Sequence, residues 1–137
     1  MKNYLKGIHH LGIAVRNIKK EAQAYVDSFG FIQETEILHE PPQKVNVQFL
    51  LLGDYRIELI EPTGEDSPIM NFINKGGVLN HICYETSDIE STVEYFKSKK
   101  NMFQTVPIIK ASTLKDCFYT FFAKPNGEVV ELIYFEG

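Results

Sequence analysis

The sequence has little of what marks several large classes of protein. It holds only two cysteines, Cys83 and Cys117, and both lie in apolar stretches, which is typical of reduced core thiols in a cytosolic protein. Basic residues are not in excess, because 14 Lys and Arg stand against 18 Asp and Glu, for a formal net charge of −4. This balance disfavours nucleic acid and anionic lipid as partners.

Long apolar runs and several chemical motifs are also absent. The longest apolar runs, such as Val47 to Leu52, are far shorter than the roughly 20 residues of a membrane span, and the first residues form no apolar signal region. The sequence has no glycine-rich phosphate loop, no CxxC pair and no serine in a nucleophile elbow. We therefore expect a cytoplasmic protein with no membrane segment.

What the sequence does contain is an internal repeat within a chain of 137 residues, the length of one domain. The stretch from His10 reads His-Leu-Gly-Ile-Ala-Val-Arg-Asn-Ile, and the stretch from His81 reads His-Ile-Cys-Tyr-Glu-Thr-Ser-Asp-Ile. In both copies an Asn or Asp suited to cap a helix follows at the same offset. Apolar residues at helical spacing come next. We therefore predict two similar modules.

Each module is predicted to consist of a strand, a helix and three further strands. The expected strands cover about 8–15, 34–40, 45–53 and 55–62 in the first module, and about 79–85, 106–112, 117–124 and 128–136 in the second. A short helix is expected to begin with Pro68 at its first position and to stop at Gly76-Gly77. The predicted fold class is therefore α+β. We expect a single domain over 1–137, with modules at about 7–62 and 79–137 and a connector at 63–78.

Two histidines and two glutamates occupy matching places in the modules. His10 precedes Glu58 by 48 residues, and His81 precedes Glu131 by 50. An ionised carboxylate on a mostly apolar strand is costly unless it is paired, solvated or bound to metal. Taken singly, each residue also fits a structural role, but the repetition favours a metal site. Two imidazoles and two carboxylates suit a divalent ion such as Zn, Ni, Co or Fe, or a harder ion such as Mn or Mg.

The other two histidines are predicted to lie outside this ligand set. His9 points to the opposite face of its strand from His10, so we expect a structural or supporting role. His39 precedes Glu40-Pro41-Pro42 and is predicted to be a solvated surface histidine.

These residues carry a resemblance to the vicinal oxygen chelate superfamily, which includes glyoxalase I, methylmalonyl-CoA epimerase, extradiol dioxygenases and bleomycin-binding proteins. The similar segments are His10-Leu-Gly-Ile-Ala-Val, Ile57-Glu-Leu-Ile-Glu-Pro62 and Val130-Glu-Leu-Ile133. Within the superfamily the chain is most similar to methylmalonyl-CoA epimerases. The segments that carry this closer resemblance are Pro62–Ile69, Phe72–Gly77 and Asn80–Cys83.

The resemblance implies a curved mixed sheet, built from two βαβββ modules in tandem around a central metal-binding cavity. It implies that His10, Glu58, His81 and Glu131 bind a divalent ion (Co, Ni, Zn, Mn or Mg), with Glu131 as the first candidate for the catalytic proton carrier. It also implies a small-molecule substrate, an acyl-CoA thioester or a thiol adduct, and a homodimer. The chain departs from the epimerases around Asn46-Val47-Gln48, where some of them carry a catalytic Glu, and at 110–117, where a glycine is usual.

The main interpretation is thus a metal-dependent isomerase that removes and returns a proton next to a carbonyl. One alternative is a lyase of the glyoxalase I type, lactoylglutathione lyase, which acts on the thiol adduct of a 2-oxoaldehyde. The other is a non-catalytic small-molecule (drug) binding protein of the same fold.

Overall fold

The structure, a computed structural model, describes residues 4–137, which divide into two compact units. One unit consists of residues 10–80, and the other of the residues up to His9 together with His81–Gly137. Strand β1 (Leu5–Ala14) contributes to both units, because the boundary falls between His9 and His10. The second boundary lies directly before the second copy of the sequence repeat. That the units form one domain stays a prediction.

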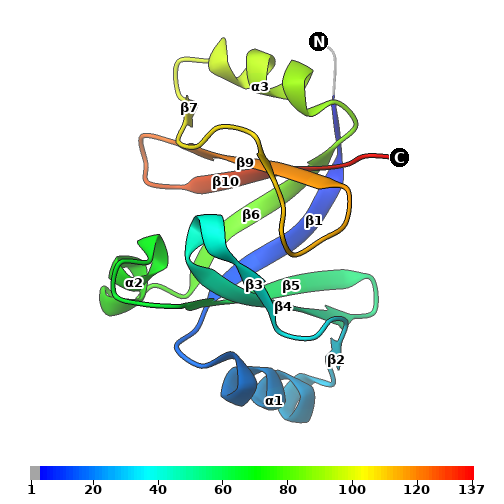
Figure 1. Cartoon of the computed structure of the whole chain (residues 1–137), viewed down its shortest axis with the longest axis vertical. Helices are drawn as coiled ribbons and strands as arrows, with labels where there is room; N and C mark the ends of the chain where they lie inside the picture. Colours follow the sequence, from blue (N-terminus) through cyan, green and yellow to red (C-terminus); the bar gives the residue numbers. More distant parts are fainter. Residues whose placement is uncertain (1–3) are drawn as a thin grey trace. The chain divides into compact units, whose positions relative to one another are not determined.

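The unit of residues 10–80 contains a mixed sheet with the strand order β2–β4–β5–β1, and β3 pairs with another part of β4. Strand β5 runs antiparallel to β4 and parallel to β1. After β1 the elements are α1 (Ile18–Phe29), β2 (Ile32–Gln33), β3 (Leu38–Glu40), the 3-10 turn η1 (Pro41–Gln43), β4 (Val45–Leu52), β5 (Tyr55–Pro62) and α2 (Pro68–Asn74). Figure 1 shows α1 below the β4–β5 hairpin and α2 beside its left-hand end.

The second unit repeats this plan. Its strand order is β6–β10–β9–β7 with β8 paired to β9, and β10 runs parallel to β6 and antiparallel to β9. The elements are β6 (Leu79–Thr86), α3 (Ile89–Lys97), β7 (Phe103–Gln104), β8 (Ile109–Lys110), β9 (Cys117–Ala123) and β10 (Val129–Phe135). The predicted α+β class with two βαβββ modules is therefore confirmed.

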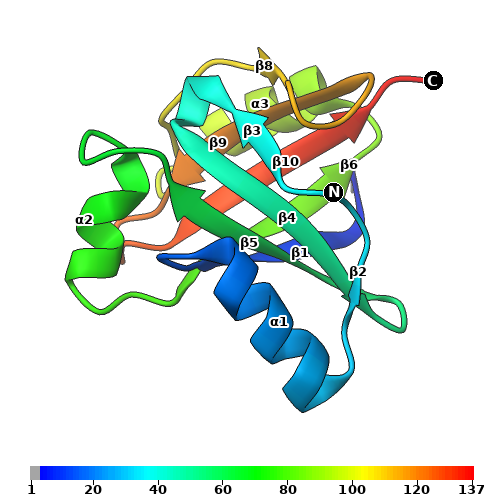
Figure 2. The same cartoon turned by 60° about the horizontal axis from the view of Figure 1, so that its bottom comes forward.

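The long helix of each unit starts and packs as the sequence pattern predicts. The Asn17 side chain accepts a hydrogen bond from the Lys20 amide, and the Asp88 side chain accepts one from the Ser91 amide. Each helix buries one apolar stripe against its sheet. The buried cluster of the first unit comprises Val15, Ile18, Ala22, Leu50, Ile57 and Leu59, and that of the second comprises Ile89, Val93, Phe122, Val130 and Leu132. Figure 2 shows α1 in front of the sheet of its unit.

The predictions of continuous strands over 34–40 and 106–112 are wrong, because only β3 and β8 lie within these segments. A separate short strand, β2 or β7, comes before each of them. The amides of Glu34 and Thr35 both donate to the carbonyl of Phe49, and the amide of Thr105 donates to the carbonyl of Phe121. Two donors that share one carbonyl leave an extra residue in the ladder, which interrupts regular pairing as a β-bulge does. The interruptions therefore lie opposite Phe49 and Phe121, in equivalent places of the two units.

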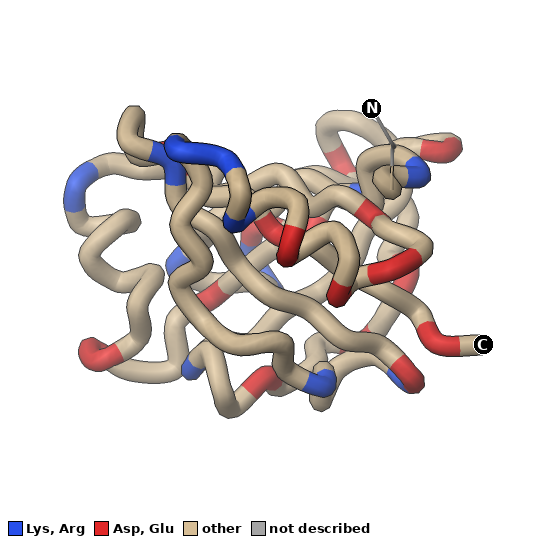
Figure 3. The backbone as a smooth tube through the Cα atoms, turned by 90° about the horizontal axis from the view of Figure 1, so that it is seen from above, with Lys and Arg blue, Asp and Glu red and all other residues tan. Residues whose placement is uncertain are grey.

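Three expectations from composition can be compared with the described residues. Cys83 and Cys117 form no disulfide and are fully buried, as predicted. Figure 3 shows basic and acidic residues interspersed along the chain. Within residues 4–137, no helix combines the length and apolar character that crossing a membrane requires.

Candidate metal centre

The first unit brings a histidine and a glutamate together on one face of its sheet. His10 on β1 and Glu58 on β5 place Nε2 and Oε1 3.3 Å apart, with side chains 1% and 12% exposed. In the parallel ladder Glu58 pairs with Gly12, two residues beyond His10, so the two side chains share a face. We call this side of the sheet the histidine face of the unit.

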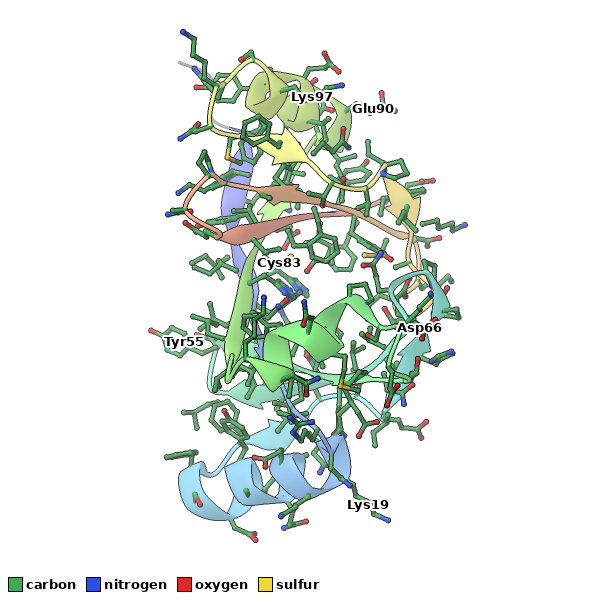
Figure 4. All side chains as sticks on the ribbon, turned by 90° about the vertical axis from the view of Figure 1, so that its left-hand side faces the viewer. Lys19, Tyr55, Asp66, Cys83, Glu90 and Lys97 are labelled. Atoms are coloured by element: carbon green, nitrogen blue, oxygen red, sulfur yellow. The ribbon has the colours of Figure 1, made fainter. Side chains whose placement is uncertain are left out.

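The second unit builds an equivalent pair from β6 and β10. His81 Nε2 and Glu131 Oε1 lie 2.9 Å apart, with side chains 3% and 9% exposed. Glu131 pairs with Cys83, which is again two residues beyond the histidine. Figure 4 labels Cys83 on β6, the strand that carries His81. The same register in both units produces the same pair.

A phenylalanine packs against each histidine in the same way. The rings of His10 and Phe49 meet edge to face with centroids 5.3 Å apart, and those of His81 and Phe121 do so at 5.5 Å. Phe49 pairs with Glu58 across the β4–β5 ladder, and Phe121 pairs with Glu131 across the β9–β10 ladder. Each pair therefore lies beside an apolar ring, which screens electrostatic interactions less than water does.

The chemistry of these donors fits a divalent metal ion. Each pair offers one imidazole nitrogen and one carboxylate oxygen on one sheet face, and all four side chains are buried or nearly so. Imidazole and carboxylate are common ligands of first-row divalent ions. The paired strands hold these donors through the backbone ladder, so each unit supplies one preformed pair of candidate ligands.

The other histidines have different surroundings. The ring of His9 lies 5.3 Å from the ring of Phe135, so it packs against an aromatic side chain. His39 is exposed, as predicted, and its Nδ1 lies 2.9 Å from the side-chain oxygen of Asn46. Asn46 in turn donates to Glu61, whose other carboxylate oxygen accepts from the backbone amide of Ile18. His39 thus belongs to a surface network that ends at the start of α1.

Sequence reasoning missed Glu40, a buried carboxylate on the histidine face. Glu40 ends β3, is 5% exposed and pairs with Val45 of β4. Val45 and Phe49 are four residues apart on β4, so they and the directly paired Glu40 point to the same face. The two prolines that follow Glu40 were the available signal, because they end the strand at this residue.

Comparison with known proteins gives a family and several relatives. A family model described as the Glyoxalase/Bleomycin resistance protein/Dioxygenase superfamily matches residues 9–121. The mitochondrial methylmalonyl-CoA epimerase of Mus musculus is 37% identical over 95 residues, which are 68% of this chain and 53% of that protein. The chain spans about half the length of the mammalian relatives it matches.

Solved structures show a similar fold at lower identity. A methylmalonyl-CoA epimerase from Mycobacterium tuberculosis superposes with a TM-score of 0.84 at 20% identity, covering 100% of this chain and 93% of that one. A methylmalonyl-CoA epimerase in complex with methylmalonyl-CoA and NH4+ superposes with a TM-score of 0.81 at 23% identity, covering 97% and 96%. At these identities the likeness concerns the fold.

Proposed function

Since the chain belongs to the Glyoxalase/Bleomycin resistance protein/Dioxygenase superfamily, we propose that it is an isomerase most like methylmalonyl-CoA epimerase. It removes a proton next to a carbonyl group and returns it. The observation that carries the proposal is the histidine–glutamate pair that both units build in the same register. The relatives named as methylmalonyl-CoA epimerases support an acyl-CoA thioester as the substrate.

His10, Glu58, His81 and Glu131 together hold one divalent ion in this proposal. The ion is Co, Ni, Zn, Mn or Mg, since the mixed nitrogen and oxygen ligands accept all of these. When bound, it supplies Lewis-acid stabilisation of the negative charge that develops on the substrate's carbonyl oxygen. The strands fix the ligands, and the phenylalanine beside each pair limits the access of water.

Glu131 is the proposed carrier of the transferred proton. Its carboxylate accepts the proton from the carbon next to the carbonyl, so a C–H bond breaks, an O–H bond forms and the electron pair is delocalised onto the carbonyl oxygen. Inversion requires that a proton be returned to the opposite side of that carbon. Glu40, the buried carboxylate on the histidine face of the first unit, is the candidate for the second proton carrier.

Isotope exchange tests this function directly. The metal-loaded protein is incubated in deuterated water with methylmalonyl-CoA and, separately, with the hemithioacetal of a 2-oxoaldehyde. We expect deuterium at the carbon between thioester and carboxylate, inversion of that carbon and no conversion of the hemithioacetal. Conversion of the hemithioacetal alone would instead identify a glyoxalase-type lyase. Binding of metal and ligand without exchange or conversion would identify a non-catalytic binding protein.

We also propose a cytoplasmic homodimer. The two buried cysteines form no disulfide, which suits a reducing compartment. Open sheets leave edge strands that pairing between subunits can cover. Sedimentation at micromolar concentration should give twice the mass of one chain. A species with the mass of a single chain would contradict the dimer.

A further inference from the structure

Ser67 is a buried serine whose hydroxyl makes no hydrogen bond to the described residues. The residue is 4% exposed, and its Oγ has no partner. Buried polar groups are nearly always hydrogen-bonded, so an unsatisfied hydroxyl calls for a physical reason such as a bound ligand or water. Other buried hydroxyls of the chain follow the rule, since Thr92 Oγ1 donates to the carbonyl of Asp88 and lies 2.7 Å from Thr86 Oγ1.

The conformation of Ser67 makes the missing bond more informative. Ser67 precedes α2 with extended backbone angles (φ −65°, ψ 135°), in the capping position where a serine side chain usually accepts a helix amide. Asn17 and Asp88 make such bonds at α1 and α3. The Ser67 side chain makes none. Its hydroxyl is therefore not needed to start the helix.

The segment before Ser67 lies at the end of the sheet of residues 10–80. The amide of Thr63 donates to the carbonyl of Lys44, and Lys44 Nζ lies 2.7 Å from Asp66 Oδ2. Figure 4 labels Asp66 beside this end of the unit. Strand β5 ends at Pro62, which pairs with Val45. The ion pair with Lys44 thus holds Asp66, the residue before Ser67, near the start of β4.

The same end of the sheet carries the buried carboxylate of Glu40. Glu40 and Pro62 both pair with Val45, one from β3 and the other from β5, so all three belong to the histidine face. Helix α2 packs against β5 and buries Ile69 and Ile73, which holds Ser67 in place. Glu40 therefore lies at the end of the histidine face, beside the strand end at Pro62 from which the chain continues to the buried Ser67.

From these observations we propose that the Ser67 hydroxyl binds the substrate by donating a hydrogen bond to one of its acceptor oxygens. The inference rests on the proposed function, because it takes the substrate to be an acyl-CoA thioester. Such a molecule offers acceptor oxygens in two places, the acyl group with its thioester carbonyl and carboxylate, and the amides of the pantetheine arm. A rigid serine adds specificity at little entropic cost, because its short side chain has a single rotor to fix.

The test compares wild type with Ser67→Ala on three thioesters of methylmalonate. These are the CoA thioester, the N-acetylcysteamine thioester, which keeps one amide of the arm, and the S-methyl thioester (here the methyl ester), which keeps none. We expect Ser67→Ala to lower kcat/KM by about fivefold to twentyfold on the CoA ester, as the loss of one hydrogen bond does. A similar loss on all three esters assigns the bond to the acyl group. A loss that disappears on the methyl ester assigns it to the arm.

Stability separates a ligand contact from a structural role. The melting temperature of Ser67→Ala should equal or exceed that of wild type, because no protein bond is lost. Thr92→Val is the matched control, since it removes a buried hydroxyl that is bonded and should lower the melting temperature by about 2–6 °C. Unchanged kcat/KM on every ester would overturn the proposal, and so would a fall in melting temperature in Ser67→Ala like that of the control.

A readout without turnover keeps this inference distinct from the proposed function. Binding of the unreactive propionyl-CoA is measured by calorimetry on the metal-loaded wild type and on Ser67→Ala. If wild type neither epimerises nor binds the thioester, the proposed function fails and takes the inference with it. If wild type does both and Ser67→Ala matches it in both, the inference alone fails.

Discussion

The two units share one frame and differ in what surrounds it. In each, a histidine lies beside a glutamate two register positions further on, and a phenylalanine packs on the histidine ring. In the second unit, the side chains near this frame are apolar, with a buried cluster of Cys83, Cys117, Tyr119 and Ile133. The backbone amide of Ala111 donates a hydrogen bond to the carbonyl of Cys117 there. The corresponding place beside Val45 in the first unit holds the buried Glu40.

This difference indicates which features the repeat has kept and which have diverged. Register and ring contact are the same in both units, and together they fix the donor atoms. The neighbouring positions carry polar groups in one unit and an apolar wall in the other. We infer that the duplicated frame serves the metal, which needs like ligands, whereas the substrate, which has unlike ends, requires unlike walls.

The strongest test of the shared frame removes one histidine at a time. Loss of a group that only hydrogen-bonds to a metal ligand already lowers metal affinity by about 10- to 100-fold. His10→Ala and His81→Ala each remove a proposed ligand itself, so each should weaken metal binding by more than about 100-fold. Turnover should fall to a similar extent while circular dichroism shows a retained fold. Metal titration and steady-state kinetics measure both effects. His39→Ala is the control and should match wild type, and full metal occupancy in His81→Ala would end the proposal.

The equivalent glutamates should differ in function despite their equivalent positions. Glu131→Gln removes the proposed proton carrier, so turnover should fall by about 10²- to 10⁴-fold. Glu58→Gln keeps an oxygen ligand at its position, so its turnover should stay within about tenfold of wild type. Rates measured at saturating metal separate the roles. Equal losses in the two variants would show that both carboxylates act as ligands alone.

Removing the helix cap of each unit should change the free energy of unfolding and leave activity unaffected. Asn17→Ala removes the bond to the Lys20 amide and should lower the free energy of unfolding by about 1 kcal/mol. Asp88→Ala should cost more, up to about 2 kcal/mol, because Asp88 also accepts from the Ser91 hydroxyl. Urea denaturation measures both values. A smaller loss in Asp88→Ala than in Asn17→Ala would contradict this ranking.

The smallest expected effect concerns a place where the units carry opposite charges. Lys44 and Asp116 precede β4 and β9 with the same left-handed backbone (φ 55° and 53°), but Lys44 pairs with Asp66. The Lys44 ammonium holds the pKa of Asp66 below its ordinary value. The native carboxyl thus binds a proton less readily than the unfolded one. The stabilisation is therefore full above the unfolded pKa, near 3.9, and disappears as the pH falls through the folded pKa.

Melting curves of wild type and Asp66→Asn check this sign. Because both side chains are exposed, the advantage of wild type at pH 6 should stay below about 2 °C, and it should shrink in high salt. At pH 2 the two proteins should melt together. An advantage of wild type that grows towards low pH would contradict the assignment.

Much of the fold could be predicted because it depends on local pattern. The strands at 45–53 and 55–62 match β4 and β5, since their apolar runs and the turn at Gly53 (φ 59°) are local features. The helix from Pro68 was found in the same way, from a proline at its first position. The pairs His10–Glu58 and His81–Glu131 followed from the repeat, because nearly equal offsets of 48 and 50 residues separate the histidine from the glutamate in each module.

What could not be predicted depends on contacts that are distant in the sequence. The break in the strand predicted at 34–40 arises because two amides share the carbonyl of Phe49, which lies on another strand. Glu40 was missed because its burial depends on pairing with β4. The unsatisfied hydroxyl of Ser67 is a property of the packed structure, and a serine before a proline predicts an ordinary helix cap.

The central claim is that the two pairs hold one ion together, and the number of divalent ions bound per wild-type chain tests it most directly. The metal-free protein is titrated with Co²⁺ and Zn²⁺, and bound metal is measured by elemental analysis after removal of the excess. The account predicts one ion per chain, lost in His10→Ala and lost equally in His81→Ala. Two ions per chain, one for each pair, would contradict it, and so would fewer than about half an ion per chain after loading.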